Sequence, residues 1–217
     1  MTIEQVIQRI REVGIIPVVR AANAVDAGHA VDAVQAGGIP IVEITLTVPD
    51  APSLIRQLVK SHGDKVLIGA GTVLTAEQAN ACLDAGAQFL VSPGLSIAVL
   101  ETAERRTTLA IPGALSPTEI MSATSQGAKL LKIFPCGSLG GAKYLKSLRG
   151  PFPNLSFIPT GGVNASNAAE LLAAGAFALG IGSELVDPAA LREGKFDKIS
   201  GAARELVEAV QSARRNS

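Results

Sequence analysis

The sequence predicts an α/β protein, a single-domain (β/α)8 barrel with an extra N-terminal helix, and three observations lead to that fold. Short apolar runs rich in β-branched residues recur roughly every 21 to 27 residues. Helical patterns lie between them and usually end on a glycine. Strands that are apolar along their whole length are typical of parallel sheets covered on both faces. Eight such units in about 200 residues favour the TIM-barrel architecture over the alternative, an open doubly wound sheet.

Each expected element has a local signal in the sequence. Residues 1–14 place apolar and charged residues at helical spacing, so we expect a helix against the bottom of the barrel. The eight strands are expected to begin near Ile15, Ile39, Val66, Ala87, Thr108, Lys129, Leu155 and Phe177. Glycines suited to the position after a helix are Gly37, Gly63, Gly86, Gly127 and Gly175. Residues 195–215 are expected to form a closing helix, and no linker divides residues 1–217 into separate domains.

Composition excludes several classes of protein. Lys+Arg and Asp+Glu both total 19 in the 217 residues, so no basic excess is present to hold nucleic acid or an anionic membrane. No stretch reaches the roughly 18 apolar residues of a membrane span, and the N-terminus has no signal-peptide pattern, so we expect a cytoplasmic protein. Two cysteines without CxxC spacing and two distant histidines argue against a disulfide scaffold, a zinc site or a histidine triad.

A lysine lies inside the apolar strand expected near residue 129. Lys132 alternates with Leu130 and Phe134, which directs its amine into the barrel mouth, where barrel enzymes keep their active sites. Burial disfavours the charged ammonium, and a neutral amine is the nucleophile that forms a Schiff base with a carbonyl. The alternative is a structural lysine that reaches the surface or pairs with a carboxylate.

A carboxylate lies inside the strand expected near residue 39. Glu43, Thr45 and Thr47 alternate along this segment and are expected to face the mouth together. A buried carboxyl group is suited to proton transfer. The alternative is a core ion pair with Lys132 or Arg20.

Two further strand ends suit a substrate carboxylate. Arg20 ends the first strand, and Thr72 follows two glycines at the end of the third. A guanidinium holds a carboxylate through two parallel hydrogen bonds, and glycines let a ligand approach the backbone. The alternative for Arg20 is an ordinary surface cation.

The last two strands end in glycine-rich turns. Gly161, Gly162 and Gly182 expose backbone N–H groups, and Asn164 and Ser183 are expected to cap the helices that follow. Helix N-termini bind anions, and the loops after strands 7 and 8 are the usual phosphate site of a barrel. The pair of turns predicts a phosphorylated substrate.

Eight segments, spread over nearly the whole chain, are similar to those of a known enzyme family: VEITLTVPDA, GAGTVLT, GAQFLVSPGL, IPGALSPTE, LLKIFP, GPFPN, FIPTGGV and GIGSELV. Through them the chain resembles the 2-keto-3-deoxy-6-phosphogluconate (KDPG) and 4-hydroxy-2-oxoglutarate (KHG) aldolases. The resemblance implies a class I aldolase, a homotrimer that needs no metal or other cofactor and yields pyruvate and glyceraldehyde 3-phosphate from KDPG. It makes Lys132 the Schiff-base lysine and Glu43 the acid/base.

The resemblance also implies positions for the substrate. Thr72 and the turn at Pro93 would line the pyruvate end, to which we also assign Thr47 and Phe134. Gly161, Gly162 and Ser183 would lie near the phosphate, and we place Gly182 there too. Many members carry an arginine where this chain has Thr47, so Arg20 is the substitute expected to hold the carboxylate.

Three other functions stay open from the sequence. The first is the related aldolase for the galactonate-derived substrate, which differs in C4 stereochemistry. The second is a phosphosugar epimerase or isomerase that uses Glu43 as base and no covalent lysine. The third, a non-catalytic phosphate-binding barrel, leaves Lys132 and Glu43 unexplained.

Overall fold

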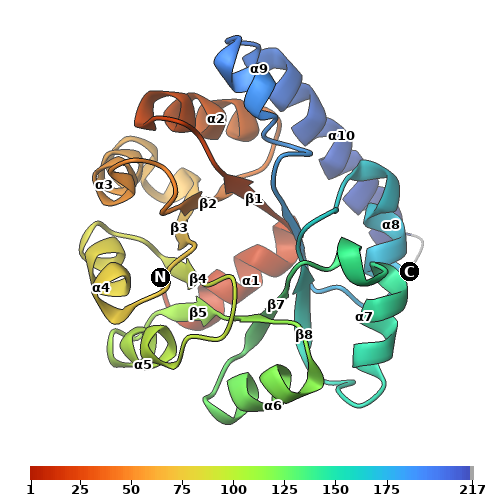
Figure 1. Cartoon of the computed structure of the whole chain (residues 1–217). Helices are drawn as coiled ribbons and strands as arrows, with labels where there is room; N and C mark the ends of the chain where they lie inside the picture. Colours follow the sequence, from red (N-terminus) through yellow and green to blue (C-terminus); the bar gives the residue numbers. More distant parts are fainter. Residues whose placement is uncertain (216–217) are drawn as a thin grey trace.

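The computed structural model describes residues 1–215, which form a curled parallel sheet surrounded by helices (Figure 1). The strands are β1 (Ile15–Val19), β2 (Ile41–Thr45), β3 (Leu67–Gly71), β4 (Phe89–Val91), β5 (Leu109–Ile111), β6 (Gly113–Ala114), β7 (Leu130–Ile133), β8 (Ser156–Pro159) and β9 (Leu179–Ile181). The helices are α1 (Ile3–Val13), α2 (Ala24–Ala36), α3 (Ala51–His62), α4 (Ala76–Asp84), α5 (Ile97–Arg105), α6 (Pro117–Ser125), α7 (Ala142–Arg149), α8 (Ala165–Ala173), α9 (Pro188–Arg192) and α10 (Phe196–Arg215), with short 3-10 turns η1 (Gly63–Lys65) and η2 (Gly137–Leu139). Strands and helices alternate, as the sequence predicts.

The parallel strands follow one another around a curl that is consistent with a TIM-like barrel. One sheet has the order β5-β4-β3-β2-β1-β9 and the other the order β6-β7-β8. Isolated parallel bridges, Phe157 with Ala176 and Thr160 with Gly180, connect the β8 region to the β9 region. The strands therefore present their C-terminal ends at one common edge.

The fifth expected strand is divided into β5 and β6 at Pro112. Proline has no N–H for the ladder, so the chain changes partner there: β5 pairs with β4, and β6 pairs with β7. The Pro112 carbonyl still accepts a hydrogen bond from the backbone N of Lys132 at 2.9 Å. This bond anchors the strand that carries the lysine.

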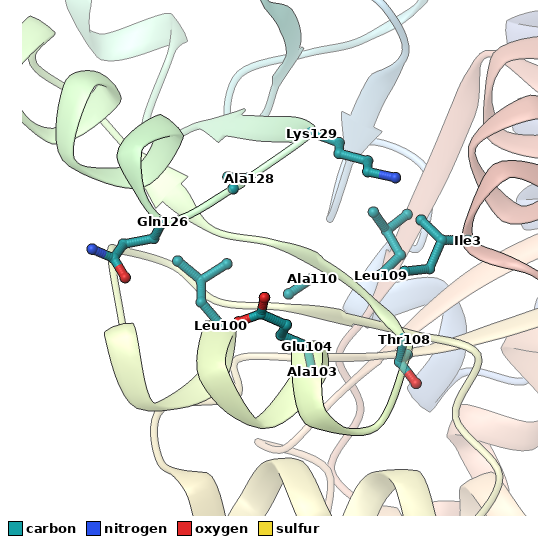
Figure 2. A pocket seen from close by; sticks show the side chains of 11 residues that line it. Ile3, Leu100, Ala103, Glu104, Thr108, Leu109, Ala110, Gln126, Ala128 and Lys129 are labelled. Atoms are coloured by element: carbon teal, nitrogen blue, oxygen red, sulfur yellow. The ribbon is translucent and has the colours of Figure 1, made fainter.

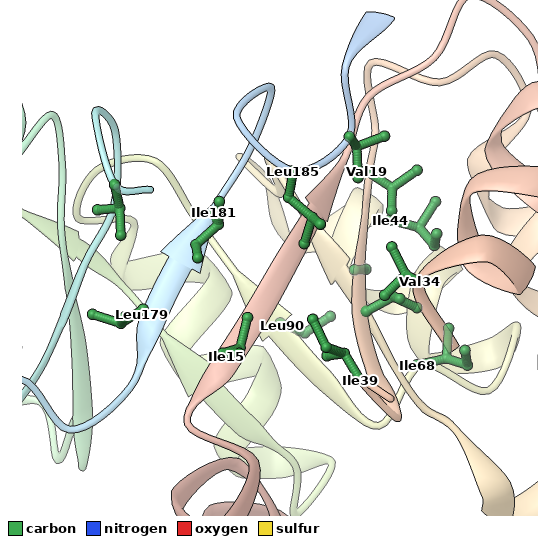
Figure 3. Packing of buried hydrophobic residues seen from close by; sticks show 14 of the residues in the cluster. Ile15, Val19, Val34, Ile39, Ile44, Ile68, Leu90, Leu179, Ile181 and Leu185 are labelled. Carbon is green, nitrogen blue, oxygen red and sulfur yellow. The ribbon is translucent and has the colours of Figure 1, made fainter. Parts of the chain in front are cut away.

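Side chains alternate between two apolar cores. One core lies between the strands and the outer helices and includes Ile15, Val42, Ile44 and Leu131, as Figure 3 shows for part of it. The second lies inside the curl, where residues from the strands meet two side chains of α1: Val6, Ile10, Ile16, Ile41, Leu67, Phe89, Val91, Leu109, Ile111, Leu130, Ile158 and Ala178. Helix α1 thus covers the N-terminal ends of the strands, and the opposite ends are left for polar groups.

Local sequence explains the helix ends, with one shift. Gly86, Gly127 and Gly175 follow their helices with φ of +99°, +81° and +90°, as expected for left-handed caps. Gly37 is instead right-handed, and Gly38 takes the left-handed conformation with φ of +95°. Gly37 is required by packing, because a Cβ there would lie 2.3 Å from the Cβ of Ala203 in α10.

In residues 1–215, no helix combines the length and the apolar character needed to cross a membrane.

Candidate active site

A lysine and a glutamate meet inside the curl near the C-terminal ends of the strands. Lys132 lies on β7 and Glu43 on β2, and each points inward because Leu130 and Ile41, two residues earlier, belong to the inner core. Lys132 is 4% exposed and Glu43 is 2% exposed. The Nζ of Lys132 lies 3.7 Å from the Oε1 of Glu43. The structure therefore brings together the two residues to which the sequence assigns the chemistry.

The surroundings of this pair are unusually poor in polar contacts. Oε1 of Glu43 is buried and accepts no hydrogen bond from the described residues. The Nζ of Lys132 lies 5.4 Å from the centre of the Phe134 ring. Leaving a buried polar group unsatisfied costs about 1–3 kcal/mol, and a buried ion pair is a weak way to stabilise a core. The pair is thus better explained by a ligand that completes its contacts than by stability.

Gly71 provides the space for the Glu43 carboxylate. The two residues lie on the adjacent strands β3 and β2, and a Cβ on Gly71 would be 1.9 Å from Oε1. Its neighbour on the same face, Gly69, makes room for the Phe89 ring, which would be 2.3 Å from an added Cβ. Each of these two β3 glycines thus serves a different layer of the interior.

We expect Gly71→Ala to lower kcat by roughly 10- to 100-fold, because the added methyl group displaces the carboxylate from its position beside the lysine. The measurement is steady-state kinetics of the cleavage reaction proposed below, with thermal unfolding as a check on the fold. Gly69→Ala is the matched control, because its methyl group meets Phe89 and should lower stability first. Normal turnover in Gly71→Ala would show that the position of the carboxylate is not limiting.

Thr45 and Thr47 form a short hydroxyl chain at the end of β2. The hydroxyl of Thr45 donates to the Val19 carbonyl at 3.0 Å and lies 2.6 Å from the hydroxyl of Thr47. Because Thr45 has only one proton, Thr47 is the donor between them. Thr47 lies in the turn after β2 and is exposed, since strand alternation has ended before it. Thr45, by contrast, is fully buried.

Two strand-end features were not predicted from the sequence. Thr72 is half-buried and has a φ of +57°, a conformation that β-branched residues rarely adopt and that costs about 1–3 kcal/mol. Gly113 allows the turn at Pro93 to approach closely, because a Cβ on Gly113 would be 2.2 Å from the Pro93 carbonyl oxygen. Thr72 and Pro93 therefore occupy constrained turns after β3 and β4.

A pocket of about 410 Å³ lies beside the pair. It contains Arg20, Phe134 and the four residues that the sequence assigns to phosphate. The other four lining residues, Val18, Thr160, Val163 and Glu184, were not predicted as site residues. The full lining is Val18, Arg20, Phe134, Thr160, Gly161, Gly162, Val163, Gly182, Ser183 and Glu184. Arg20 and Glu184 are its only charged residues, and both are exposed.

The two glycine turns of this pocket differ in structure. Asn164 caps α8 as predicted, because its side chain accepts hydrogen bonds from the backbone N of Ser166 and Asn167. Ser183 does not cap a helix, so that expectation is wrong. It lies in a turn in which the N–H groups of Leu185 and Val186 bond to the Gly182 carbonyl. Helix α9 begins later, where Asp187 caps it and Pro188 occupies its first position.

The cysteine that follows β7 is buried. Burial raises the pKa of the Cys136 thiol to about 11, and its Sγ donates to the Gly141 carbonyl at 3.6 Å. Among residues 1–215, no three histidine, cysteine, aspartate or glutamate side chains are grouped as metal ligands.

A second pocket, of about 190 Å³, lies near the strand N-termini (Figure 2). Its walls include Leu100, Leu109 and Ile3, and its polar members include Lys129. Lys129 is half-exposed at its side chain and pairs with Glu4 at 3.0 Å, the surface arrangement that Lys132 lacks. The two lysines of this segment therefore differ in environment.

The fold is a curled parallel α/β structure, in which a buried lysine and carboxylate lie at the strand C-termini next to a glycine-lined pocket. These features together are typical of the class of aldolases that form a lysine Schiff base. The chain belongs to the KDPG and KHG aldolase family, whose model matches residues 6–202.

Individual relatives are similar over nearly the whole chain. The KHG/KDPG aldolase of Escherichia coli (strain K12) is 37% identical over 194 residues, which cover 89% of this chain and 91% of that protein. A KDPG aldolase from Legionella pneumophila, solved with pyruvate captured as a covalent carbinolamine, has a TM-score of 0.86 at 33% identity and covers 92% of this chain and 97% of its own. A native KDPGal structure also has a TM-score of 0.86, at 32% identity, covering 93% of this chain and 96% of that one.

Proposed function

We propose that this protein is a class I aldolase that cleaves KDPG to pyruvate and glyceraldehyde 3-phosphate, and KHG to pyruvate and glyoxylate. The observation that carries the proposal is the buried Lys132–Glu43 pair, with 3.7 Å between nitrogen and oxygen. Family membership and the carbinolamine captured in the Legionella pneumophila relative support it.

The first half of the reaction forms the Schiff base. Glu43 takes a proton from the Lys132 ammonium, and the neutral amine attacks the C2 ketone of the substrate. The carbinolamine then loses its hydroxyl as water, with the proton returned by Glu43. Because Oε1 of Glu43 accepts no hydrogen bond from the described residues, it is available for both transfers.

The second half breaks the C3–C4 bond. The Glu43 carboxylate, directly or through water, accepts the proton of the C4 hydroxyl, and the electron pair of the bond moves to the iminium nitrogen. The aldehyde leaves, and the enamine is protonated at C3. Hydrolysis of the resulting iminium releases pyruvate and regenerates the Lys132 amine.

The test is a side-by-side cleavage assay with KDPG, its C4 epimer and KHG, in which pyruvate release is followed by a coupled dehydrogenase. We expect cleavage of KDPG and KHG and no loss of rate in the presence of a chelator, because the iminium supplies the electron sink. Faster cleavage of KDPG than of its C4 epimer would favour the gluconate series, and faster cleavage of the epimer would favour the galactonate alternative. Conversion without pyruvate release would favour the epimerase or isomerase.

We further propose that the strand-end residues bind the two ends of the substrate. Thr47, Thr72, Pro93 and Phe134 bind the pyruvate moiety, and the location of Phe134 beside the Lys132 amine supports its role. The backbone N–H groups of the turns at Gly161, Gly162, Gly182 and Ser183 bind the phosphate, with the α8 N-terminus behind them.

We expect Arg20→Ala to raise KM for the substrate by about 10- to 100-fold, the loss that follows removal of a charge-assisted bidentate contact. The substrate carboxylate is the proposed partner of Arg20. Its place beside Gly161 and Gly182 gives the phosphate as a second candidate. Steady-state kinetics with KDPG and KHG decide: equal loss on both assigns Arg20 to the carboxylate, and loss on KDPG alone assigns it to the phosphate.

Arg20→Lys is the companion variant, because it keeps the charge and removes the planar fork. Intermediate impairment is expected. Full activity in Arg20→Ala would show that Arg20 is a surface cation only.

We also propose that the chain is one domain, a (β/α)8 barrel with α1 as its additional helix, which the bridges between the β8 and β9 regions support. We propose that the protein assembles as a homotrimer and that it is located in the cytoplasm. The family resemblance supports the trimer, and the free thiols of Cys82 and Cys136 support a reducing compartment.

A further inference from the structure

The pocket beside the catalytic pair contains a carboxylate that the proposed reaction does not use. Glu184 lies directly after the turn formed by Gly182 and Ser183, on the rim of the pocket. Among residues 1–215, it has neither a salt bridge nor a side-chain hydrogen bond, and Arg20 is the one cation in the same lining. Its charge is therefore free to act on whatever occupies the pocket.

A carboxylate in a phosphate pocket opposes binding. A phosphate monoester carries nearly two negative charges at neutral pH, while the pocket offers one guanidinium and one carboxylate, which cancel. Like charges less than a Debye length apart, about 8–10 Å at physiological salt, repel each other. The backbone N–H groups of the glycine turns then have to hold the phosphate without net positive charge around it.

We propose that Glu184 is a specificity-determining residue that weakens binding of phosphorylated 2-keto acids relative to unphosphorylated ones. This inference rests on the proposed function, because it concerns the distal end of the same substrate. Glu184 acts on the distal group alone, since Lys132 and Glu43 lie within the curl and Glu184 lies on the exposed rim. Its effect should therefore appear in KM and not in kcat.

The first experiment compares Glu184→Gln with the unchanged protein. The amide keeps the size of the side chain and removes its charge, so KM for KDPG should fall by about 3- to 10-fold. KM for KHG should fall less, because its distal group is a carboxylate with one charge, and both kcat values should change by less than about 2-fold. The advantage of the variant should shrink as salt is raised from about 20 to 300 mM, because screening removes the repulsion. Glu208→Gln is the matched control, a charge loss on the exposed face of α10.

The second experiment measures binding of inorganic phosphate by calorimetry, which needs no catalysis. Glu184→Gln should bind phosphate several-fold more tightly than the unchanged protein or Glu208→Gln. Equal phosphate affinity in all three proteins, or an equal change of KM for KDPG and KHG, would overturn the role of Glu184. If the protein cleaves neither KDPG nor KHG, the proposed function is wrong. The calorimetric phosphate affinities would then still test whether Glu184 weakens phosphate binding.

Discussion

Lys132→Ala should abolish aldol cleavage, with a loss of roughly 10⁴-fold or more, because no other group at the site can form the Schiff base. Treatment of the unchanged protein with pyruvate and borohydride should add one reduced pyruvyl group, and peptide mass spectrometry should locate it on Lys132. The physical basis is that Lys132 is 4% exposed and lies within an apolar strand beside a carboxylate.

Lys129→Ala is the matched control for this prediction. Lys129 lies three residues earlier but pairs with Glu4 at the opposite end of the strands, so its loss should leave cleavage and trapping intact. A pyruvyl group on any lysine other than 132, or normal turnover in Lys132→Ala, would contradict the covalent mechanism.

Glu43→Gln should lower kcat by about 10²- to 10⁴-fold while the fold is retained. The amide has nearly the shape of the carboxylate, so it fits the space above Gly71, but it cannot accept and return a proton. Because the lysine is still present, borohydride should trap pyruvate on Lys132, only more slowly. These two measurements separate a proton-transfer role from loss of the nucleophile.

Two results would count against this role. Near-normal turnover in Glu43→Gln would assign proton transfer to water or to the substrate itself. A variant that unfolds at lower temperature and traps no pyruvate would indicate that Glu43 serves mainly to balance the charge of Lys132. Thermal unfolding measured alongside the kinetics distinguishes these cases.

The sequence predicted those parts of the protein that follow from periodicity. All eight strand starts agree with the structure to within about two residues, because uninterrupted apolar runs and terminal glycines are strong local signals. The inward orientation of Lys132 and Glu43 follows from the alternation of side chains along a strand, so their location inside the curl could also be predicted.

Other features depend on distant contacts and could not be predicted from local pattern. The alternation of side chains stops at the end of β2, so the strand pattern did not predict that Thr47 is exposed. Ser183 has the residue type of a helix cap. The helix nevertheless begins a few residues later, where Asp187 is the cap and Pro188 is the first helical residue. The role of Gly71 depends on a side chain from the neighbouring strand.

The inner core and α1 occupy the bottom of the curl, whereas the reactive pair and the pocket occupy the top. This division separates the residues that form the inner core from those that we propose to contact the substrate. Changes at the exposed positions of the turn after β9, Ser183 and Glu184, leave the buried layers untouched, so substrate range can be engineered there without an equal cost in stability. Sequence libraries for new acceptor aldehydes are thus best confined to residues 182–184, with the buried Val163, Leu185 and Val186 of the same turns held constant together with β2, β7 and α1.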